Sequence, residues 1–202
     1  MLSASTLAIL ILGLYFIKLK RQMHTYIALF RGINVSGQKI IKMTDLKRYL
    51  EECGLRSVCT YIQSGNVVFS SKNPDQNDLV QVIKKKIVEQ YGFEVSVMIK
   101  TRADLIHILD ANPFMNDPER DTARMYFTML SSVPEAELVE KLQRYDYSPE
   151  EYALLNDIVY FYSPKAYGKA KMNNNFFENK LKVIATTRNL RTLEKLINLT
   201  GG

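Results

Sequence analysis

YIQSGNVVF, residues 61–69, is the most informative segment of the sequence. Apolar, strand-forming residues flank a polar turn that ends in Gly65 and Asn66, two residue types that tolerate the positive φ of tight turns. We therefore predict a hairpin with strands at Val58–Ile62 and Val67–Phe69. A second polar motif, RGIN at residues 31–34, follows another apolar run, Tyr26–Phe30.

The elements around this hairpin predict one ferredoxin-like unit. The order is a strand at 26–30, a helix that ends at Gly54, the hairpin, a helix that ends at Gly92, and a strand at 95–99. This strand, helix, strand, strand, helix, strand order is the split βαβ plait. The apolar faces of the two helices consist of Met43, Leu46, Leu50 and Cys53 in the first and of Leu79, Val82, Ile83 and Ile87 in the second.

The same order partly repeats in the second half of the chain. We expect a strand at 124–130, a helix opened by Ser132 and Glu135, a hairpin around Asn156 and Asp157, a helix near Phe177, and a short strand at 183–187. Asn189 then caps a final helix whose inward residues are Leu190, Leu193, Leu196 and Ile197.

We therefore predict an α+β protein made of two ferredoxin-like halves with a C-terminal helix. The first half covers residues 23–100 and the second covers 124–202. A linking helix and loop, residues 101–123, join them, and Thr101 with Asp104 forms a capping box at the start of that helix. Residues 1–22 are a separate apolar extension.

The extension allows two interpretations. Residues 2–17 are mostly apolar and precede Lys18, Lys20 and Arg21, but sixteen residues make only about 24 Å of helix at 1.5 Å per residue, less than the roughly 30 Å hydrocarbon core. They are either a short membrane anchor that leaves the domain in the cytoplasm, or an extension that arises from a start upstream of Met23. The localisation we predict is cytoplasmic.

The positive charge is concentrated near the C-terminus. The net charge is +6, and through Ser163 the 19 basic and 19 acidic residues cancel. Beyond Ser163, 8 basic residues face 2 acidic ones, which gives 8 − 2 = +6. Such segregation is typical of proteins that bind a polyanion or a phosphate, although a solvated basic face is the alternative.

Few residues suit covalent or metal chemistry. Cys53 and Cys59 lack the further cysteines or paired histidines of a zinc site, so we predict reduced thiols and no metal or cofactor. Ser64 has no evident base, because His24 and His107 lie in other elements. Catalytic residues cannot be assigned.

Topology predicts a shared polar rim. In a split βαβ plait the first two strands run in the same direction, so the loops that follow them lie at one edge. This places Arg31, Gly32 and Asn34 beside Gln63, Ser64, Gly65 and Asn66. Guanidinium and amide groups there would suit a planar or phosphate-like ligand; alternatively, the glycines and asparagines only shape the loops.

A second candidate site lies at the start of the final helix. Thr187, Arg188, Asn189 and Arg191 place two arginines where the helix dipole is positive, so a negative group should lie nearby. That group is either a bound anion or an acidic side chain from elsewhere in the fold, and Lys169 and Lys171 would extend the surface. Tyr160 and Tyr162 suggest base stacking, but packing under a helix is the interpretation we favour.

Five segments resemble the bacterial domain-of-unknown-function 1697 family. They are YIALFRGINVSGQKIIKM (26–43), TYIQSGNVVF (60–69), ANPF (111–114), GKAKM (168–172) and ATTRN (185–189). The resemblance implies two plait-like α/β parts, a cytosolic location and no established activity, and it does not cover the first 22 residues. It also implies that the two predicted sites fall on the family's motifs, although Leu190 stands where relatives often have an aromatic residue.

Three functional hypotheses follow. The first is a cytosolic module that binds an anion: a nucleotide, nucleic acid or phosphorylated small molecule. The second is an enzyme of unknown reaction that uses the rim of Arg31, Asn34, Gln63 and Ser64, and the third is a structural scaffold. A membrane is a partner only if residues 2–17 insert, and the oligomeric state is not predictable from the sequence.

Overall fold

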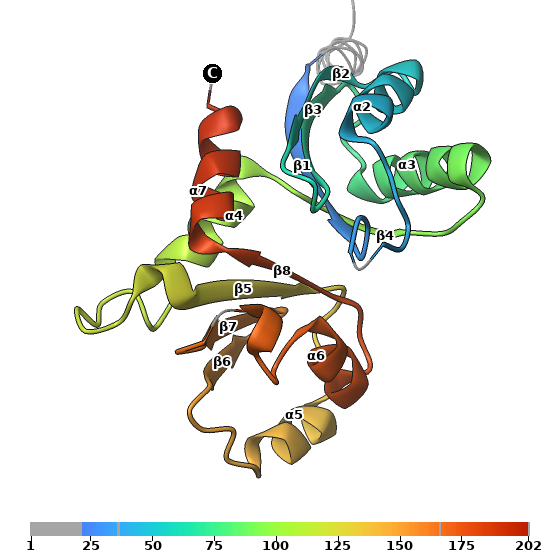
Figure 1. The fold of residues 1–202 in the computed structure, drawn as a ribbon. Helices are drawn as coiled ribbons and strands as arrows, with labels where there is room; N and C mark the ends of the chain where they lie inside the picture. Colours follow the sequence, from blue (N-terminus) through green and yellow to red (C-terminus); the bar gives the residue numbers. More distant parts are fainter. Residues whose placement is uncertain (1–21, 36, 166, 202) are drawn as a thin grey trace, which may run out of the picture.

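The first half of the computed structural model, which describes residues 22–35, 37–165 and 167–201, is a four-stranded antiparallel sheet covered by two helices (Figure 1). Its strands are β1 (His24–Arg31), β2 (Arg56–Tyr61), β3 (Asn66–Ser71) and β4 (Ser96–Lys100), in the order β2-β3-β1-β4. Its helices are α2 (Met43–Glu52) and α3 (Gln76–Tyr91).

The second half repeats this arrangement. Its strands are β5 (Met125–Leu130), β6 (Glu151–Leu155), β7 (Ile158–Tyr162) and β8 (Ala185–Asn189), in the equivalent order β6-β7-β5-β8. Its helices are α5 (Ala136–Gln143) and α6 (Asn174–Leu181), and two 3₁₀ turns lie at Thr122–Arg124 and Tyr167–Lys169. The prediction of two ferredoxin-like halves is confirmed.

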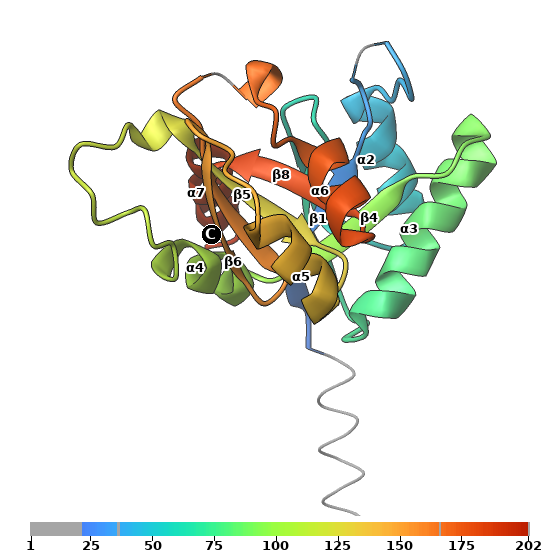
Figure 2. The same cartoon turned by 90° about the horizontal axis from the view of Figure 1, so that it is seen from below.

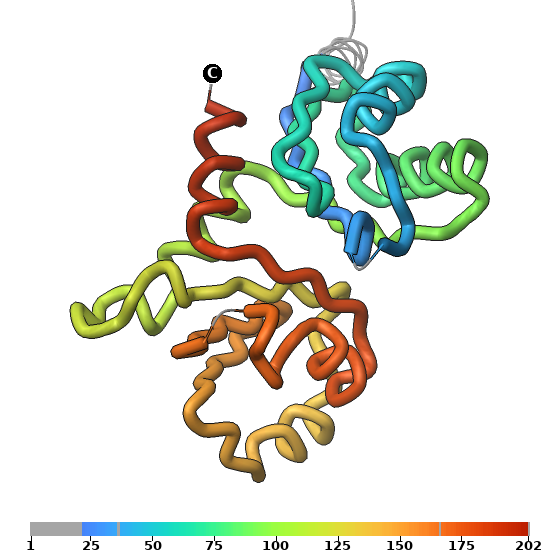
Figure 3. The backbone as a smooth tube through the Cα atoms, viewed as in Figure 1, coloured from blue at the N-terminus to red at the C-terminus, as the bar shows by residue number. Residues whose placement is uncertain are grey.

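Helices α4 (Arg102–Asp110) and α7 (Leu190–Leu199) pack together on the inner side of both sheets (Figures 1 and 2). They bury their apolar faces against β1 and β3 of the first sheet and β5 and β7 of the second. Outer helices α2 and α3 cover the other face of the first sheet, and α5 and α6 cover that of the second. The tube in Figure 3 shows the segment that contains β8 passing beside the end of β1.

Burial of both faces explains the continuous apolar runs of the central strands. In β1, Tyr26, Ala28 and Phe30 face the outer helices, whereas Ile27 and Leu29 face the shared central core. β5 alternates in the same way between the central core and the core under α5 and α6. Successive strand residues point to opposite faces, so a run without polar interruption requires cover on both sides.

The predicted caps of α4 and α7 are confirmed. Thr101 and Asp104 form a reciprocal capping box, and the Asn189 side chain accepts a hydrogen bond from Thr192 N at 3.0 Å. The final helix buries Leu190, Leu193, Leu196 and Ile197, as its spacing predicts.

Three local predictions are wrong. The box at Ser132 does not form, and α5 begins at Ala136 because Pro134 disfavours helical geometry at the residue before it. In the β2–β3 turn positive φ falls on Ile62 and Gly65, while Asn66 belongs to β3 and is buried. Val82 is 39% exposed, because the buried stripe of α3 consists of Leu79, Ile83 and Ile87.

The extension at residues 1–22 lies outside the described ranges except for Gln22, so both interpretations of it stay predictions. In the described ranges, no helix has both the length and the apolar content that crossing a bilayer requires.

Candidate functional site

The RGIN and QSGN motifs lie side by side at the end of β1. Phe30 N donates to Gly65 O at 2.8 Å, and Asn34 Nδ2 donates to Gln63 O at 2.9 Å. The convergence that topology predicts is therefore present.

Gly65 is required by packing. Its φ is +76°, and a Cβ at this position would lie 2.6 Å from Phe30 Cβ and 2.6 Å from Ile33 Cδ1. Contacts that short cannot be accommodated, since core packing leaves little room for movement. Gly65 thus allows the turn to close onto β1.

The asparagine side chains of both motifs form their hydrogen bonds with other groups of the protein. Asn34 donates to Ile41 O at 2.9 Å and accepts from Ile41 N at 2.8 Å. Asn66 is buried, and its amide donates to Tyr61 O and Ser64 Oγ, both at 3.1 Å. These side chains fix loop geometry, as the alternative interpretation of the rim proposed.

Arg188 joins the two halves of the molecule. Its guanidinium is buried and donates to Asn66 Oδ1 through Nε, to Thr186 Oγ1 and Thr187 O through Nη1, and to three carbonyl oxygens of the first half through Nη2. Those carbonyls are Phe30 O at 2.9 Å, Ser64 O at 3.1 Å and Gly65 O at 3.3 Å. All five N–H groups have protein acceptors, so none is left for a ligand.

No carboxylate is among the acceptors of Arg188 within the described residues. Burial lowers the pKa of its guanidinium to about 10, and the nearby Arg31 contributes in the same direction. The side chain therefore carries a desolvated charge that is held by dipoles of carbonyl, amide and hydroxyl groups, which makes it a structural connection.

The other residues of the second predicted site also have structural roles or lie apart. Thr187 Oγ1 donates to Asn174 Oδ1 at 2.6 Å, and Asn189 caps α7. Arg191 is exposed on α7. Lys169 and Lys171 line a different cavity of about 60 Å³ with Lys165 and Tyr147.

Arg31 has an acidic partner from the second half. Its Nε and Nη2 donate to the two carboxylate oxygens of Glu178, both at 2.9 Å, and Nη2 also donates to Asn175 Oδ1 at 2.7 Å. Among the described residues no acceptor lies at Arg31 Nη1, so this nitrogen can still donate. Gly32 follows with a φ of +69° and open space around its α carbon.

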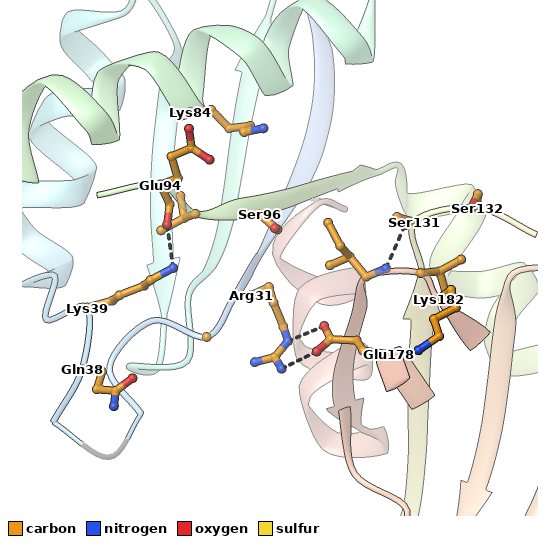
Figure 4. Close-up of a pocket in the computed structure, with 14 residues that line it drawn as sticks. Arg31, Gln38, Lys39, Lys84, Glu94, Ser96, Ser131, Ser132, Glu178 and Lys182 are labelled. Atoms are coloured by element: carbon orange, nitrogen blue, oxygen red, sulfur yellow. Dashed lines mark hydrogen bonds and ion pairs between the residues drawn. The ribbon is translucent and has the colours of Figure 1, made fainter. Parts of the chain in front are cut away.

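Arg31 and Glu178 lie in a cleft between the halves with a volume of about 900 Å³ (Figure 4). Lys39 and Lys84 line it from the first half and Lys182 from the second. Lys39 Nζ donates to the carbonyl oxygen of Glu94 at 2.7 Å, a contact that leaves its charge unbalanced. Within the described ranges no carboxylate lies within 4.0 Å of the ammonium groups of Lys84 or Lys182.

The lining therefore has excess positive charge. Four basic residues (Arg31, Lys39, Lys84 and Lys182) and two acidic ones (Glu94 and Glu178) give 4 − 2 = +2 at neutral pH. Of these six residues, only Arg31 was predicted from the sequence to belong to a site. Only Lys182 belongs to the basic C-terminal stretch, so the segregated charge of the sequence did not indicate this cleft.

Several predicted residues remain outside this cleft. Gln63 is exposed on the β2–β3 turn, and Ser64 is half-buried, with its hydroxyl accepting from Asn66. Tyr160 is 2% exposed and Tyr162 packs against the central core, so packing accounts for these rings. Among the described residues, no cluster of His, Cys, Asp and Glu could hold a metal ion, and both cysteines are free thiols.

Sequence comparison assigns the family. A profile of the family described as protein of unknown function DUF1697 matches residues 23–160. The chain belongs to the DUF1697 family. No curated protein matches the sequence.

A solved structure supports the fold of this DUF1697 chain. It is that of a conserved bacterial protein from Streptococcus pneumoniae, with 24% sequence identity and a TM-score of 0.69. The alignment covers 89% of this chain and 99% of the bacterial protein. At this level of identity the similarity concerns the fold alone.

Proposed function

We propose that this DUF1697 protein is an anion-binding module and that its ligand binds in the cleft between the two halves. The ligand classes are those that carry phosphate: a nucleotide, a nucleic acid or a phosphorylated metabolite. The observation that carries this proposal is the pair of Lys84 and Lys182, which line one cleft from opposite halves without a carboxylate partner among the described residues.

The cleft offers donors of two kinds. Lysine ammonium groups act as point charges that attract phosphate, while Arg31 Nη1 can add a directed hydrogen bond beside them. The pairing of Arg31 with Glu178 fixes the guanidinium in place, so that donor is oriented before a ligand arrives. Ser96, Ser131 and Ser132 add hydroxyl groups to the lining.

Calorimetric titration of the full chain with ATP, a sugar phosphate and a short oligonucleotide tests the proposal. The affinity of the best ligand should fall as salt rises from about 50 to 200 mM, because phosphate contacts release counterions. Lys84→Gln and Lys182→Gln should each weaken it about fivefold to tenfold, as expected for one charged hydrogen bond.

Matched controls are available next to these two lysines in the chain. Lys85 is exposed next to Lys84, and Lys180 lies two residues before Lys182, yet neither lines the cleft. Lys85→Gln and Lys180→Gln should leave the affinity within about twofold of wild type. Equal losses in all four variants, or binding without salt dependence, would reject the cleft as the site.

A further inference from the structure

Strand β4 has an open hydrogen-bonding edge. It is an outer strand of the first sheet and pairs only with β1. Phe30 N bonds toward β3, so by the alternation of antiparallel strands Leu29 and Arg31 bond toward β4, opposite Met98 and Ser96. The N–H and C=O groups of Val97 and Ile99 therefore point away from the sheet, and the described chain gives them no partner.

Two of the other sheet edges are less open to pairing. At β8, Ala185 N donates to Glu178 Oε1 at 3.0 Å, and Thr187 O accepts from Arg188 at 2.8 Å. At β2, the register shifts between Arg56 and Cys59, and such irregularities discourage pairing. Within the described residues, β4 has neither side-chain hydrogen bonds to its outer edge nor a shift in register. It also contains no proline or glycine.

Two cavities that share Ser131 lie along this open edge, and we call them together the groove. Ser96 lines the large cleft, while residues 97–100 line an adjoining cavity of about 230 Å³, and Ser131 borders both. α3 forms one wall of the second cavity through Val80, and Leu130 of the second half forms the other. An added strand would lie about 4.8 Å from β4, in this space.

The charges at the two ends of the groove determine the direction in which an added peptide strand would run. At the Ser96 end the groove opens into the cleft of Arg31, Lys39, Lys84 and Lys182, whereas at the other end Lys100 is paired with Asp157 at 3.3 Å. A strand antiparallel to β4 would place its C-terminal end among the cations. A parallel strand would place a positive amino terminus there, which is unfavourable.

We propose that β4 binds an extended peptide as an additional antiparallel strand, with the acidic C-terminal end of the peptide in the basic cleft. This inference rests on the proposed anion site and goes beyond its phosphate ligands, because it adds peptide carboxylates as a second class of anion. Nucleic acid fits the groove less well, since its charge repeats along the chain while the cations cluster at one end. The middle of the groove instead offers peptide groups and apolar side chains.

The proposal can be tested with a library of heptapeptides that have free C-termini. The full chain is immobilised, and the peptides that bind to it are selected. Enriched peptides should be acidic at the C-terminal end, and amidation should weaken them about tenfold. Lys84→Glu with Lys182→Glu should abolish their binding, whereas Lys85→Glu with Lys180→Glu should not.

Backbone methylation decides whether the peptide pairs as a strand. N-methyl groups at alternate residues in one register should weaken the best peptide at least about tenfold, and methyl groups in the other register should be tolerated, because only one set of N–H groups faces β4. No enrichment, or equal losses in both registers, would overturn the strand proposal. Phosphate ligands could still bind, with affinity lost in Lys84→Gln and Lys182→Gln. That result would support the anion site even though the strand proposal had failed.

Discussion

Arg188 Nη2 lies 2.9 Å from the carbonyl oxygen of Phe30, which joins residues that are 158 positions apart in the chain. This contact connects β8 of the second half to the end of β1 in the first. The same nitrogen reaches Ser64 O and Gly65 O in the β2–β3 turn. The ATTRN and QSGN motifs are thus two sides of one internal junction, and this explains why Asn66, Thr186 and Arg188 are buried.

Removing the guanidinium should destabilise the protein. Arg188→Met removes the guanidinium donors of Phe30 O, Ser64 O, Gly65 O and Asn66 Oδ1, at a cost of about 3 kcal/mol in the free energy of unfolding. Urea unfolding monitored by circular dichroism measures this loss in the free energy of unfolding. The control is Arg191→Met, an exposed position that should stay within about 0.5 kcal/mol of wild type. A stable Arg188→Met protein would show that the junction is dispensable.

Alanine substitutions at Gly65 and Gly37 separate the cost of steric overlap from the cost of a positive φ. Gly65→Ala should cost about 3 kcal/mol, since its Cβ would overlap Phe30 and Ile33 in addition to the unfavourable φ. Gly37 has a similar φ of +73° but open space around it, so Gly37→Ala should cost only about 1 kcal/mol. Denaturant midpoints of the two variants report the difference. Equal effects would mean that the β2–β3 turn can move away from β1.

The pairing of Arg31 with Glu178 should contribute modestly to stability. A double-mutant cycle with Arg31→Met and Glu178→Gln should give a coupling energy of about 1 kcal/mol, because the pair is bidentate but partly exposed. Raising the salt concentration should reduce this energy. A coupling near zero at low salt would indicate that Arg31 is held by Asn175 and the loop rather than by the carboxylate.

Tyr91 should influence stability at alkaline pH. Burial raises the pKa of its phenol above the ordinary value of 10.0, with the charge of Asp45 adding to the shift. The folded protein therefore holds this proton more tightly than the unfolded chain. The resulting stabilisation is complete below pH 10 and is lost as the pH rises through the folded-state pKa.

The Tyr91→Phe variant checks this pH dependence. The hydroxyl of Tyr91 is buried and has no hydrogen-bond partner in the described structure, so the variant should be as stable as wild type at pH 7 and should lose less stability above pH 10. Tyr167→Phe is the contrast, because the Tyr167 oxygen accepts from Asn174 N at 3.0 Å and its removal should already cost about 1 kcal/mol at pH 7. Unfolding curves at pH 7 and 10.5 separate the two, and parallel behaviour of Tyr91→Phe and wild type at both pH values would contradict the assignment.

The fold was largely predictable because each element has a local signal. Gly54, Gly92 and the Asn156-Asp157 turn mark the ends of elements, and the order of elements fixes the topology. Topology alone also predicted that Asn34 lies beside Gln63. The prediction that a helix begins at Ser132 was wrong, because a capping pattern does not outweigh the effect of Pro134 on the residue before it.

The candidate site was less predictable because it depends on how the halves meet. Arginine is rarely buried, so the sequence suggested that Arg188 faces a ligand. The partner of Arg31 lies 147 residues away, a separation for which helix or strand periodicity carries no signal. Lys84 is the first of three consecutive lysines, and only the packing of α3 selects it to line the cleft.

We propose that the anion binds in the cleft between the halves. The most direct measurement is a titration of isotopically labelled full chain with ATP, followed through backbone amide chemical shifts. We expect saturable shifts at Lys84, Ser96, Lys182 and Ile184, which line the cleft from both halves. Shifts confined to the other basic surface at Lys165, Lys169 and Lys171, with the cleft amides unchanged, would show that the anion does not bind in the cleft.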